Sequence, residues 1–332
     1  MKNQLRVGVI GVGNMGLHHA RNYSQIPTVR LCAVADFDES RAHAAATRFG
    51  GTPYSDYREM LARERLDAIS VVVPTRDHLS VAFDVISAGV NLLIEKPLAA
   101  TITEAEAIVA AAHAADVKIA VGHIERFNPA VQELKRRVDA GALGEISSIV
   151  AKRVGVLPPQ VKDANVINDL AVHDIDILNY FFGVMPTEVF ASAGRALLSD
   201  RYDHAEIFLK YQNVGCFVQV NWITPLKIRT LSVTGDAGYA ELNYVTQKLE
   251  IYESNLEREY NDFGDFVVRF GEARRTVVPL QVREPLRAEL DDFVEAVAND
   301  RAPQVSGQVG VSVLRVVEEI EAALAQTANE KT

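Results

Sequence analysis

The sequence of 332 residues contains little cysteine: there are only two, Cys32 and Cys216. Each stands alone inside an apolar, strand-like run, so neither a disulfide framework nor a cysteine-rich zinc site is expected. No apolar run is long enough to cross a bilayer, and the N-terminus lacks the apolar core and cleavage site of a signal peptide. These absences predict a cytoplasmic protein.

Positive charge is also scarce, since 34 Lys and Arg residues against 44 Asp and Glu residues give a net charge of −10. This balance argues against a general nucleic-acid binder, which needs a basic surface. It does not exclude a small anionic ligand that is held by a few local cations. The chain is 48% hydrophobic, which is enough apolar material for the two domains that its length favours.

The first part of the chain, residues 1–122, alternates apolar β-branched runs with helical patterns. Strands that are apolar throughout and separated by helices indicate a parallel sheet that is covered on both faces. We therefore predict a doubly wound α/β domain of the Rossmann type. Its expected strands are LRVGVI (5–10), VRLCAVAD (29–36), AISVVVP (68–74), NLLIE (91–95) and KIAVG (118–122).

The second part, residues 123–332, has a different pattern. Short alternating strands occupy residues 145–252, separated by turn signals such as YQNVG and TGDAG. This predicts an α+β domain on a mostly antiparallel open sheet, which would bind substrate and support oligomerisation. Helices are expected over residues 166–182, beside the sheet, and over 285–298 and 309–326.

The segment VGVIGVGNMGLHHAR carries Gly11, Gly13 and Gly16 in G-x-G-x-x-G spacing. It follows the first predicted strand and opens a helix, and Asp36 ends the second predicted strand, which is the context of a dinucleotide site. Gly11 permits the tight turn, Gly13 lets a pyrophosphate approach the backbone, and Gly16 allows close packing of helix and strand. A glycine turn that binds nothing is the alternative.

Two further features of this site indicate its cofactor. The amides of Asn14 and Met15, at the positive end of the helix, would bind the diphosphate. The carboxylate of Asp36 can accept hydrogen bonds from both hydroxyls of the adenine ribose, and it would repel a 2′-phosphate. The sequence therefore predicts NAD in preference to NADP.

The segment NDLAVHDIDILNYFF is an apolar helical pattern with a line of ionisable groups. Asp169, His173, Asp176 and Tyr180 recur at steps of four, three and four, which places them on one face of a helix. An amphipathic helix with its polar face in water is the ordinary interpretation. Asp174 lies off this face and is expected to be structural.

Four motifs together resemble the Gfo/Idh/MocA family of nicotinamide-dependent sugar oxidoreductases: VIGVGNMGLHHA, VVVPTRDHLSVA, LLIEKPLA and NDLAVHDID. The resemblance covers essentially the whole chain and agrees with the two-domain organisation. It implies an NAD-dependent enzyme that oxidises a secondary hydroxyl. The positions that it implies at the cofactor are Pro74, Thr75, His78, Glu95 and Lys96.

The resemblance also implies a catalytic role for the polar helix face, which would line an interdomain cleft opposite Lys96. His173 would accept the hydroxyl proton, because histidine titrates near neutrality. Asp169 would orient the imidazole, and Lys96 would stabilise the developing alkoxide, so no metal is expected. Asp176 and Tyr180 would act indirectly.

The segment GHIERFNPA matches the family's crossing from the cofactor domain to the substrate domain. The resemblance makes Arg126 and Asn128 substrate-binding candidates in this segment. Arg153 is a third candidate because it lies, with Lys152 and Lys162, shortly before the polar helix in an otherwise acidic chain. Such cations could bind a diphosphate, although ordinary exposed charges are the alternative.

Within the family, VGHIERFNPAV and KRVGVLPPQVKDANVINDLAVHDIDILNYFFG are most similar to enzymes that oxidise the 3-hydroxyl of UDP-N-acetylglucosamine, often for a subsequent aminotransferase. Two alternatives stay open: an NAD-dependent dehydrogenase of a neutral polyol such as myo-inositol or glucose, and a catalytically silent dinucleotide sensor. The family also implies a homodimer or homotetramer.

Overall fold

The computed structural model describes residues 4–159, 164–253, 256–260, 266–270 and 273–329. The chain divides into two compact units: unit 1 comprises Met1–Ile124 and Glu284–Arg315, and unit 2 comprises Glu125–Arg283 and Val316–Thr332. The sequence pattern suggested a single boundary between residues 122 and 123. The observed division is discontinuous because the helix that follows Glu284 packs into the core of unit 1, and a linear pattern does not reveal such a return.

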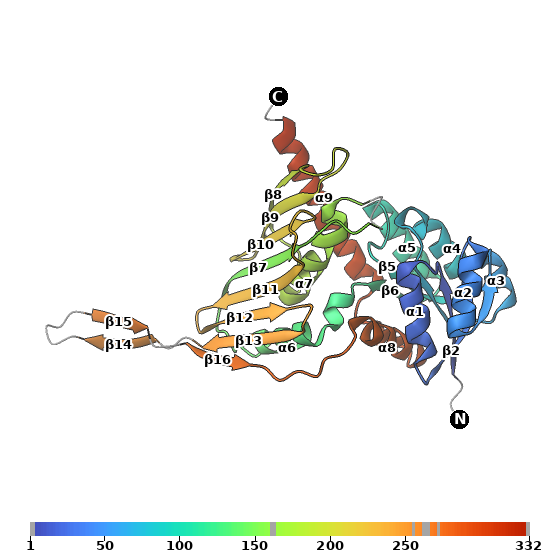
Figure 1. The fold of residues 1–332 in the computed structure, drawn as a ribbon, viewed down its shortest axis with the longest axis horizontal. Helices are drawn as coiled ribbons and strands as arrows, with labels where there is room; N and C mark the ends of the chain where they lie inside the picture. The colour runs from blue at the N-terminus through green and yellow to red at the C-terminus, as the bar shows by residue number, and fades with distance from the viewer. Residues whose placement is uncertain (1–3, 160–163, 254–255, 261–265, 271–272, 330–332) are drawn as a thin grey trace. The chain divides into compact units, whose positions relative to one another are not determined.

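Unit 1 is built on a six-stranded sheet with the order β3-β2-β1-β4-β5-β6 (Figure 1). All of its strand pairs are parallel, which confirms the predicted doubly wound Rossmann sheet. Its elements are β1 (Leu5–Ile10), α1 (Asn14–Ser24), β2 (Val29–Ala35), α2 (Glu39–Phe49), β3 (Thr52–Tyr54), α3 (Tyr57–Arg63), β4 (Ala68–Val71), η1 (Thr75–Asp77), α4 (His78–Ser87), β5 (Asn91–Glu95), α5 (Ile102–Ala114), β6 (Ile119–Gly122) and α8 (Pro285–Ala298).

The core of unit 1 joins the central strand β1 to the helices α1 and α8. Val7 and Val9 of β1 pack in one cluster with Tyr23 of α1 and Phe293 of α8. Strand β1 lies between β2 and β4, so the strand order reverses at this point. Ligands of open α/β sheets bind beyond the carboxyl ends of the strands at such a reversal. The loops after β1 and β4 are therefore where a cofactor site is expected.

Unit 2 is built on an eight-stranded sheet with the order β16-β13-β12-β11-β7-β10-β9-β8. Its neighbouring strands are antiparallel except for β7 and β10, which are parallel, and the expected mostly antiparallel sheet is thus confirmed. Its elements are η2 (Ile124–Phe127, shared with unit 1), α6 (Pro129–Asp139), β7 (Ile146–Val154), η3 (Ile167–Ala171), α7 (Val172–Phe182), β8 (Glu188–Gly194), β9 (His204–Tyr211), β10 (Val214–Asn221), β11 (Ile228–Gly235), β12 (Gly238–Asn243), β13 (Lys248–Glu253) and β16 (Arg274–Val277).

Three elements complete the described chain. Strands β14 (Leu256–Tyr260) and β15 (Phe266–Phe270) form a separate antiparallel pair. Helix α9 (Gly307–Asn329) contributes its first residues to unit 1 and the residues from Val316 onward to unit 2. Among the described residues, no helix is long and apolar enough to span a membrane.

The two faces of the eight-stranded sheet differ. Helices α6 and α7 lie on one face, which we call the inner face (Figure 1). Side chains alternate between faces along a strand, and the inner positions Ile149 and Ala151 of β7 are buried, as are Leu231 and Val233 of β11. The intervening position Val150 is 43% exposed on the opposite, outer face. The inner face therefore carries the core of unit 2, and the outer face has exposed apolar positions among the described residues.

Candidate active site

The glycine-rich loop after β1 has the backbone geometry that its motif predicts. Gly11 has a φ of +87°, and a Cβ at this position would lie 2.4 Å from the carbonyl oxygen of Val72. A Cβ on Gly16 would lie 1.9 Å from the carbonyl oxygen of Gly11. Gly13 is different, because a Cβ there would meet nothing within 4 Å. Gly11 and Gly16 are thus required by the protein itself, whereas Gly13 leaves open space over the loop.

The start of α1 fits a phosphate group. No side chain caps the helix at Gly13, and its first turn contains no acidic residue. The first amides of an α-helix have no partner inside the helix and carry its positive end. Asn14 is exposed and Met15 is half-buried, so these amides face accessible space. The residues present therefore fit the diphosphate of a dinucleotide.

Asp36 lies directly after β2 and is tied to the same loop. Its Oδ2 accepts a hydrogen bond from the amide of Val12 at 2.9 Å, and its Oδ1 accepts one from the amide of Asp38 at 3.0 Å. Each carboxylate oxygen can accept more than one hydrogen bond. Asp36 therefore keeps acceptor capacity for a ribose diol while it holds the loop in place.

The segment after β4 contains the predicted residues Pro74, Thr75 and His78. Pro74 is exposed and Thr75 is half-buried, but His78 is buried. Its Nε2 lies 3.0 Å from the carbonyl oxygen of Val73 and its Nδ1 lies 2.9 Å from that of Pro97. Burial lowers the pKa of His78, against the opposing effect of these backbone groups. His78 joins the segments after β4 and β5 and thus helps to position both of them.

Glu95 and Lys96, at the end of β5, belong to a polar cluster. Glu95 Oε1 lies 3.0 Å from Nε2 of His19, and Glu95 Oε2 accepts a hydrogen bond from the amide of Lys96 at 3.1 Å. Nδ1 of His19 lies 3.0 Å from Oγ of Ser70. Burial by itself raises the pKa of Glu95, but His19 and the Lys96 ammonium outweigh it and lower the pKa. Glu95 is thereby kept as an anion beside half-buried Lys96.

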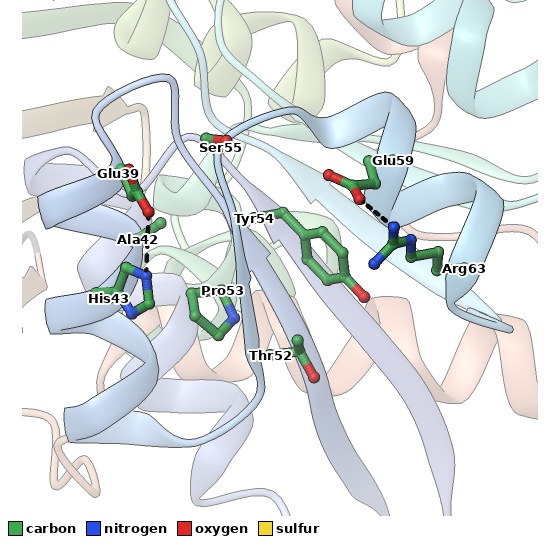
Figure 2. Close-up of a pocket in the computed structure, with 9 residues that line it drawn as sticks. All are labelled: Glu39, Ala42, His43, Thr52, Pro53, Tyr54, Ser55, Glu59 and Arg63. Carbon is green, nitrogen blue, oxygen red and sulfur yellow. Dashed lines mark ion pairs between the residues drawn. The ribbon is translucent and has the colours of Figure 1, made fainter.

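A pocket on unit 1 lies away from these residues. In Figure 2 its lining side chains come from α2, β3 and α3, and they include the ion pairs Glu39–His43 and Glu59–Arg63. Neither the glycine-rich loop nor Asp36 lines it. The pocket is therefore separate from the predicted dinucleotide site.

The helix that carries Asp169 and His173 differs from the predicted continuous α-helix. It begins as the π-helical turn η3 and continues as α7. A π turn is wider than an α turn and often occurs at functional sites. Asp169 lies in η3 and His173 lies at the second position of α7; both are half-buried. The other two members of the polar line have a different environment.

Asp176 is fully buried and is bound by Arg126. Nε of Arg126 lies 2.9 Å from both carboxylate oxygens of Asp176, and its guanidinium carbon lies 4.9 Å from the ring centroid of Tyr180. The single polar face is therefore divided, because Asp176 and Tyr180 contact Arg126. This engagement gives Arg126 a structural role.

Arg153 and Asn128 are engaged in a second buried network. Arg153 donates to both oxygens of Asp174 and to Glu125 Oε1 at 3.0 Å, and it lies over the ring of Tyr244. Burial by itself lowers the pKa of Arg153, but Asp174 and Glu125 raise it above its ordinary value. Asn128 caps α6 through the amide of Ala130. Both side chains thus have structural partners, and Asp174 holds Arg153 in place.

The remaining predicted cations are Lys152 and Lys162. Lys152 shares the outer face with Val150, away from α7, because side chains alternate along β7. Lys162 lies outside the described residues. The cation on the inner face that sequence reasoning missed is Arg229 of β11. Its position could have been found, since it alternates with Leu231 and Val233 in a strand whose other inward residues are apolar.

No group of three or more His, Cys, Asp or Glu side chains is placed to hold a metal ion in the described part of the chain.

A dinucleotide-binding Rossmann unit joined to an open-sheet unit defines an oxidoreductase architecture. Residues 5–123 match the family model described as "Oxidoreductase family, NAD-binding Rossmann fold", and residues 131–241 match the GFO/IDH/MocA C-terminal domain. The chain belongs to the Gfo/Idh/MocA family of NAD-binding oxidoreductases.

Known relatives of similar length are dehydrogenases. UDP-N-acetylglucosamine 3-dehydrogenase of Acidithiobacillus ferrooxidans is 30% identical over 96% of this chain and 97% of its own length. The scyllo-inositol 2-dehydrogenase (NAD(+)) of Bacillus subtilis is 27% identical over 92% of this chain and 90% of its own. A solved structure of the Acidithiobacillus enzyme superimposes with a TM-score of 0.85 over 97% of this chain and 98% of that chain. The predicted family and enzyme class are confirmed.

Proposed function

We propose that this protein oxidises the 3-hydroxyl of UDP-N-acetylglucosamine to a ketone, with NAD as the oxidant. The observation that carries the proposal is the similarity to the Acidithiobacillus enzyme, which is named for this reaction and aligns with 96% of the chain. The keto sugar is the kind of product that an aminotransferase would consume. We therefore also propose an aminotransferase as the enzyme that follows.

The cofactor would be held by the glycine-rich loop, the first amides of α1 and Asp36. Bound NAD supplies the acceptor for the hydride that leaves the carbinol carbon. The residues of the chain must orient the sugar and remove the hydroxyl proton. Open space over Gly13 and the uncapped start of α1 support this assignment.

His173 is our candidate for the proton acceptor. A neutral imidazole can take a proton near neutral pH. His173 is half-buried at the start of α7, and Asp169 lies one turn before it, in η3. A carboxylate at this spacing can favour the protonated imidazole that forms during the reaction.

Lys96 is our candidate for stabilising the developing alkoxide. An ammonium group that is already positioned stabilises the negative charge in the transition state more strongly than it stabilises a neutral hydroxyl. Its anionic neighbour Glu95 keeps the local charge balanced before substrate binds. This arrangement supports Lys96 as the group that donates to the substrate oxygen.

The test is a turnover assay in which the product is removed. Oxidation of a secondary alcohol by NAD is unfavourable near neutral pH, so the ketone should be trapped chemically or with a sugar aminotransferase and glutamate. We expect NADH to form with UDP-N-acetylglucosamine and to exceed the signal with myo-inositol and glucose. Saturable oxidation of a neutral polyol, with no oxidation of any UDP-sugar under trapping, would contradict the proposed substrate.

A neutral polyol is the second candidate substrate. The observation that favours it is the similarity to scyllo-inositol 2-dehydrogenase and to the myo-inositol 2-dehydrogenase of Thermotoga maritima, which is 25% identical over 93% of the chain. The same proton acceptor and alkoxide-stabilising group would serve this reaction. The trapping assay therefore distinguishes the substrates without changing the proposed mechanism.

We also propose that unit 2 forms a homodimer or homotetramer through the outer face of its sheet. Exposed apolar side chains are aligned across four adjacent strands, because Phe190 pairs with Phe208, Phe208 with Phe217, and Phe217 with Val150. Their exposed fractions are 59%, 37%, 40% and 43%, in that order along the row. A contiguous exposed apolar row is a common feature of protein interfaces, and a second copy of the chain presents a matching row.

A further inference from the structure

Arg229 is a cation on the inner face of the eight-stranded sheet. Leu231 and Val233 alternate with it along β11 and are buried, and the strand register places Arg229 directly opposite Arg153 of β7. Directly opposed residues share one face of a sheet. Two like charges are therefore neighbours, and this arrangement is unfavourable unless other charges compensate for it.

The two arginines differ in how they are compensated. Arg153 forms ion pairs with Asp174 at 2.8 Å and with Glu125 at 3.0 Å. No carboxylate of the described residues forms an ion pair with Arg229. Burial, the largest effect, lowers the pKa of Arg229, and the charge of Arg153 lowers it further, against the opposing effect of the carboxylates of Asp174, Asp169 and Glu125. A half-buried cation in this state is stabilised when an anion binds.

The guanidinium of Arg229 is held in one orientation. Its Nη1 donates to the carbonyl oxygens of Val154 at 2.6 Å and Ile228 at 3.0 Å. Among the described residues these are the side-chain hydrogen bonds of Arg229, so Nη2 and Nε keep donor capacity. A planar guanidinium that is fixed by one nitrogen can present its remaining donors to an oxyanion.

Gly155 leaves room beside this group. A Cβ at position 155 would lie 3.8 Å from both Nη1 and Nη2 of Arg229. Gly155 is not among the described glycines with positive φ, so its backbone does not require glycine. A larger side chain would extend from this position over the two terminal nitrogens. The absence of a side chain at this position therefore keeps them accessible.

Arg229 is also linked to the segment that carries His173. Arg153, its partner across the strands, binds Asp174, the next residue after His173. The charge of Asp169 is among those that act on Arg229. All of these residues belong to unit 2.

We propose that Arg229 is the oxyanion-binding residue of the substrate site and that it binds the diphosphate of the nucleotide sugar. The inference rests on the proposed function, in which the substrate is a UDP-sugar. It assigns to Arg229 the role that the sequence suggested for Arg153, whose guanidinium is engaged by two carboxylates. Discrimination against neutral polyols then comes from this residue, because an uncharged substrate cannot compensate its charge.

The test measures binding and turnover separately with the full chain. UDP and inorganic pyrophosphate are titrated calorimetrically into the protein without NAD, and KM and kcat are measured for UDP-N-acetylglucosamine. Arg229→Gln should weaken UDP binding and raise KM by roughly 10- to 100-fold, with kcat changed much less, and Arg229→Lys should recover part of the affinity. Arg275→Gln is the matched control, since Arg275 is an exposed arginine of β16 that pairs with Glu250.

Gly155→Val provides a second test if Arg229→Gln does not fold, because it would cover the terminal nitrogens and leave the charge in place. It should also weaken UDP binding. Unchanged UDP affinity in folded Arg229→Gln, or in Gly155→Val, would overturn the inference, as would a wild type that binds neither UDP nor pyrophosphate. Loss of UDP binding in Arg229→Gln, with no oxidation of any UDP-sugar by the wild type, would support the inference while contradicting the proposed function.

Discussion

Arg153 holds Asp174 through two hydrogen bonds, with Nε 2.8 Å from Oδ2 and Nη2 3.0 Å from Oδ1. The pair connects β7 to α7, and both side chains are almost completely buried, at 4% and 1% exposure. It fixes the helix residue that follows His173. An intact buried ion pair adds little to the net stability of a protein. Loss of one partner destabilises the fold strongly, because the other charge stays buried without compensation.

Asp174→Asn should therefore destabilise the protein by about 3 to 5 kcal/mol, since Arg153 would lose one of its two charged partners. The measurement is denaturant unfolding of the wild type and the variant, monitored by circular dichroism. Glu133→Gln, which breaks partly exposed ion pairs on α6, is the control and should change stability much less. Equal losses in the free energy of unfolding for the two variants would contradict a larger contribution from the buried pair.

His173→Asn and Lys96→Met should each lower kcat by about two orders of magnitude or more, because their interactions strengthen as charge moves in the transition state. Dinucleotide affinity, measured by fluorescence titration, should stay close to that of the wild type. Asp169→Asn should cause a smaller loss, since it orients the base and does not itself take the proton. His43→Asn, at an exposed position on α2, is the control, and near-normal turnover in His173→Asn would refute the proposed base.

Asp36→Ser should weaken or reverse a preference for NAD over NADP. The carboxylate pairs with a ribose diol and opposes a 2′-phosphate, whereas a serine hydroxyl does not repel phosphate. Steady-state kcat/KM values for both cofactors provide the measurement. Thermal melting of each variant must accompany them, because Asp36 also accepts a hydrogen bond from the amide of Val12 and its loss can destabilise the loop. Equal use of NAD and NADP by the wild type would contradict the assignment.

Glu95 should make stability depend on pH in the acid range. The pKa of Glu95 is lowered in the folded protein from an ordinary value of 4.5, so its contribution is fully present above the unfolded pKa. That contribution is lost as pH falls through the folded pKa. The difference in melting temperature between the wild type and Glu95→Gln should therefore shrink as pH is lowered from 6 toward 3. A difference that stays constant over this range would contradict the argument.

Phe208→Glu should reduce the oligomeric state, because it places a charge in the middle of the exposed apolar row of the outer face. Light scattering coupled to size exclusion should show a shift toward the 36.4 kDa mass of one chain. Val282→Glu, which is at an exposed position outside the row, is the control and should keep the wild-type mass. A wild type that is already monomeric would rule out the proposed interface.

Most of the correct predictions concern features that depend on residues close together in the chain. The run NLLIE coincides with β5, and the glycine motif lies between β1 and α1 as its spacing requires. Strand β3, by contrast, was not predicted, because its three residues are too few to show a pattern. The π turn at Ile167–Ala171 was also missed, since its sequence fits an α-helix equally well.

The sequence alone determined the order of elements, the parallel and antiparallel character of the two sheets, the dinucleotide loop and the family, because each depends on local spacing and hydrophobic periodicity. Tertiary structure decided which charged residues remain available to a ligand. The sequence did not show that Arg126 and Arg153 form ion pairs with Asp176 and Asp174. Arg229 lies opposite Arg153 only through strand pairing across 76 residues of chain. The reason is physical: burial and ion pairing depend on partners distant in the sequence, and residue type and spacing do not specify those partners.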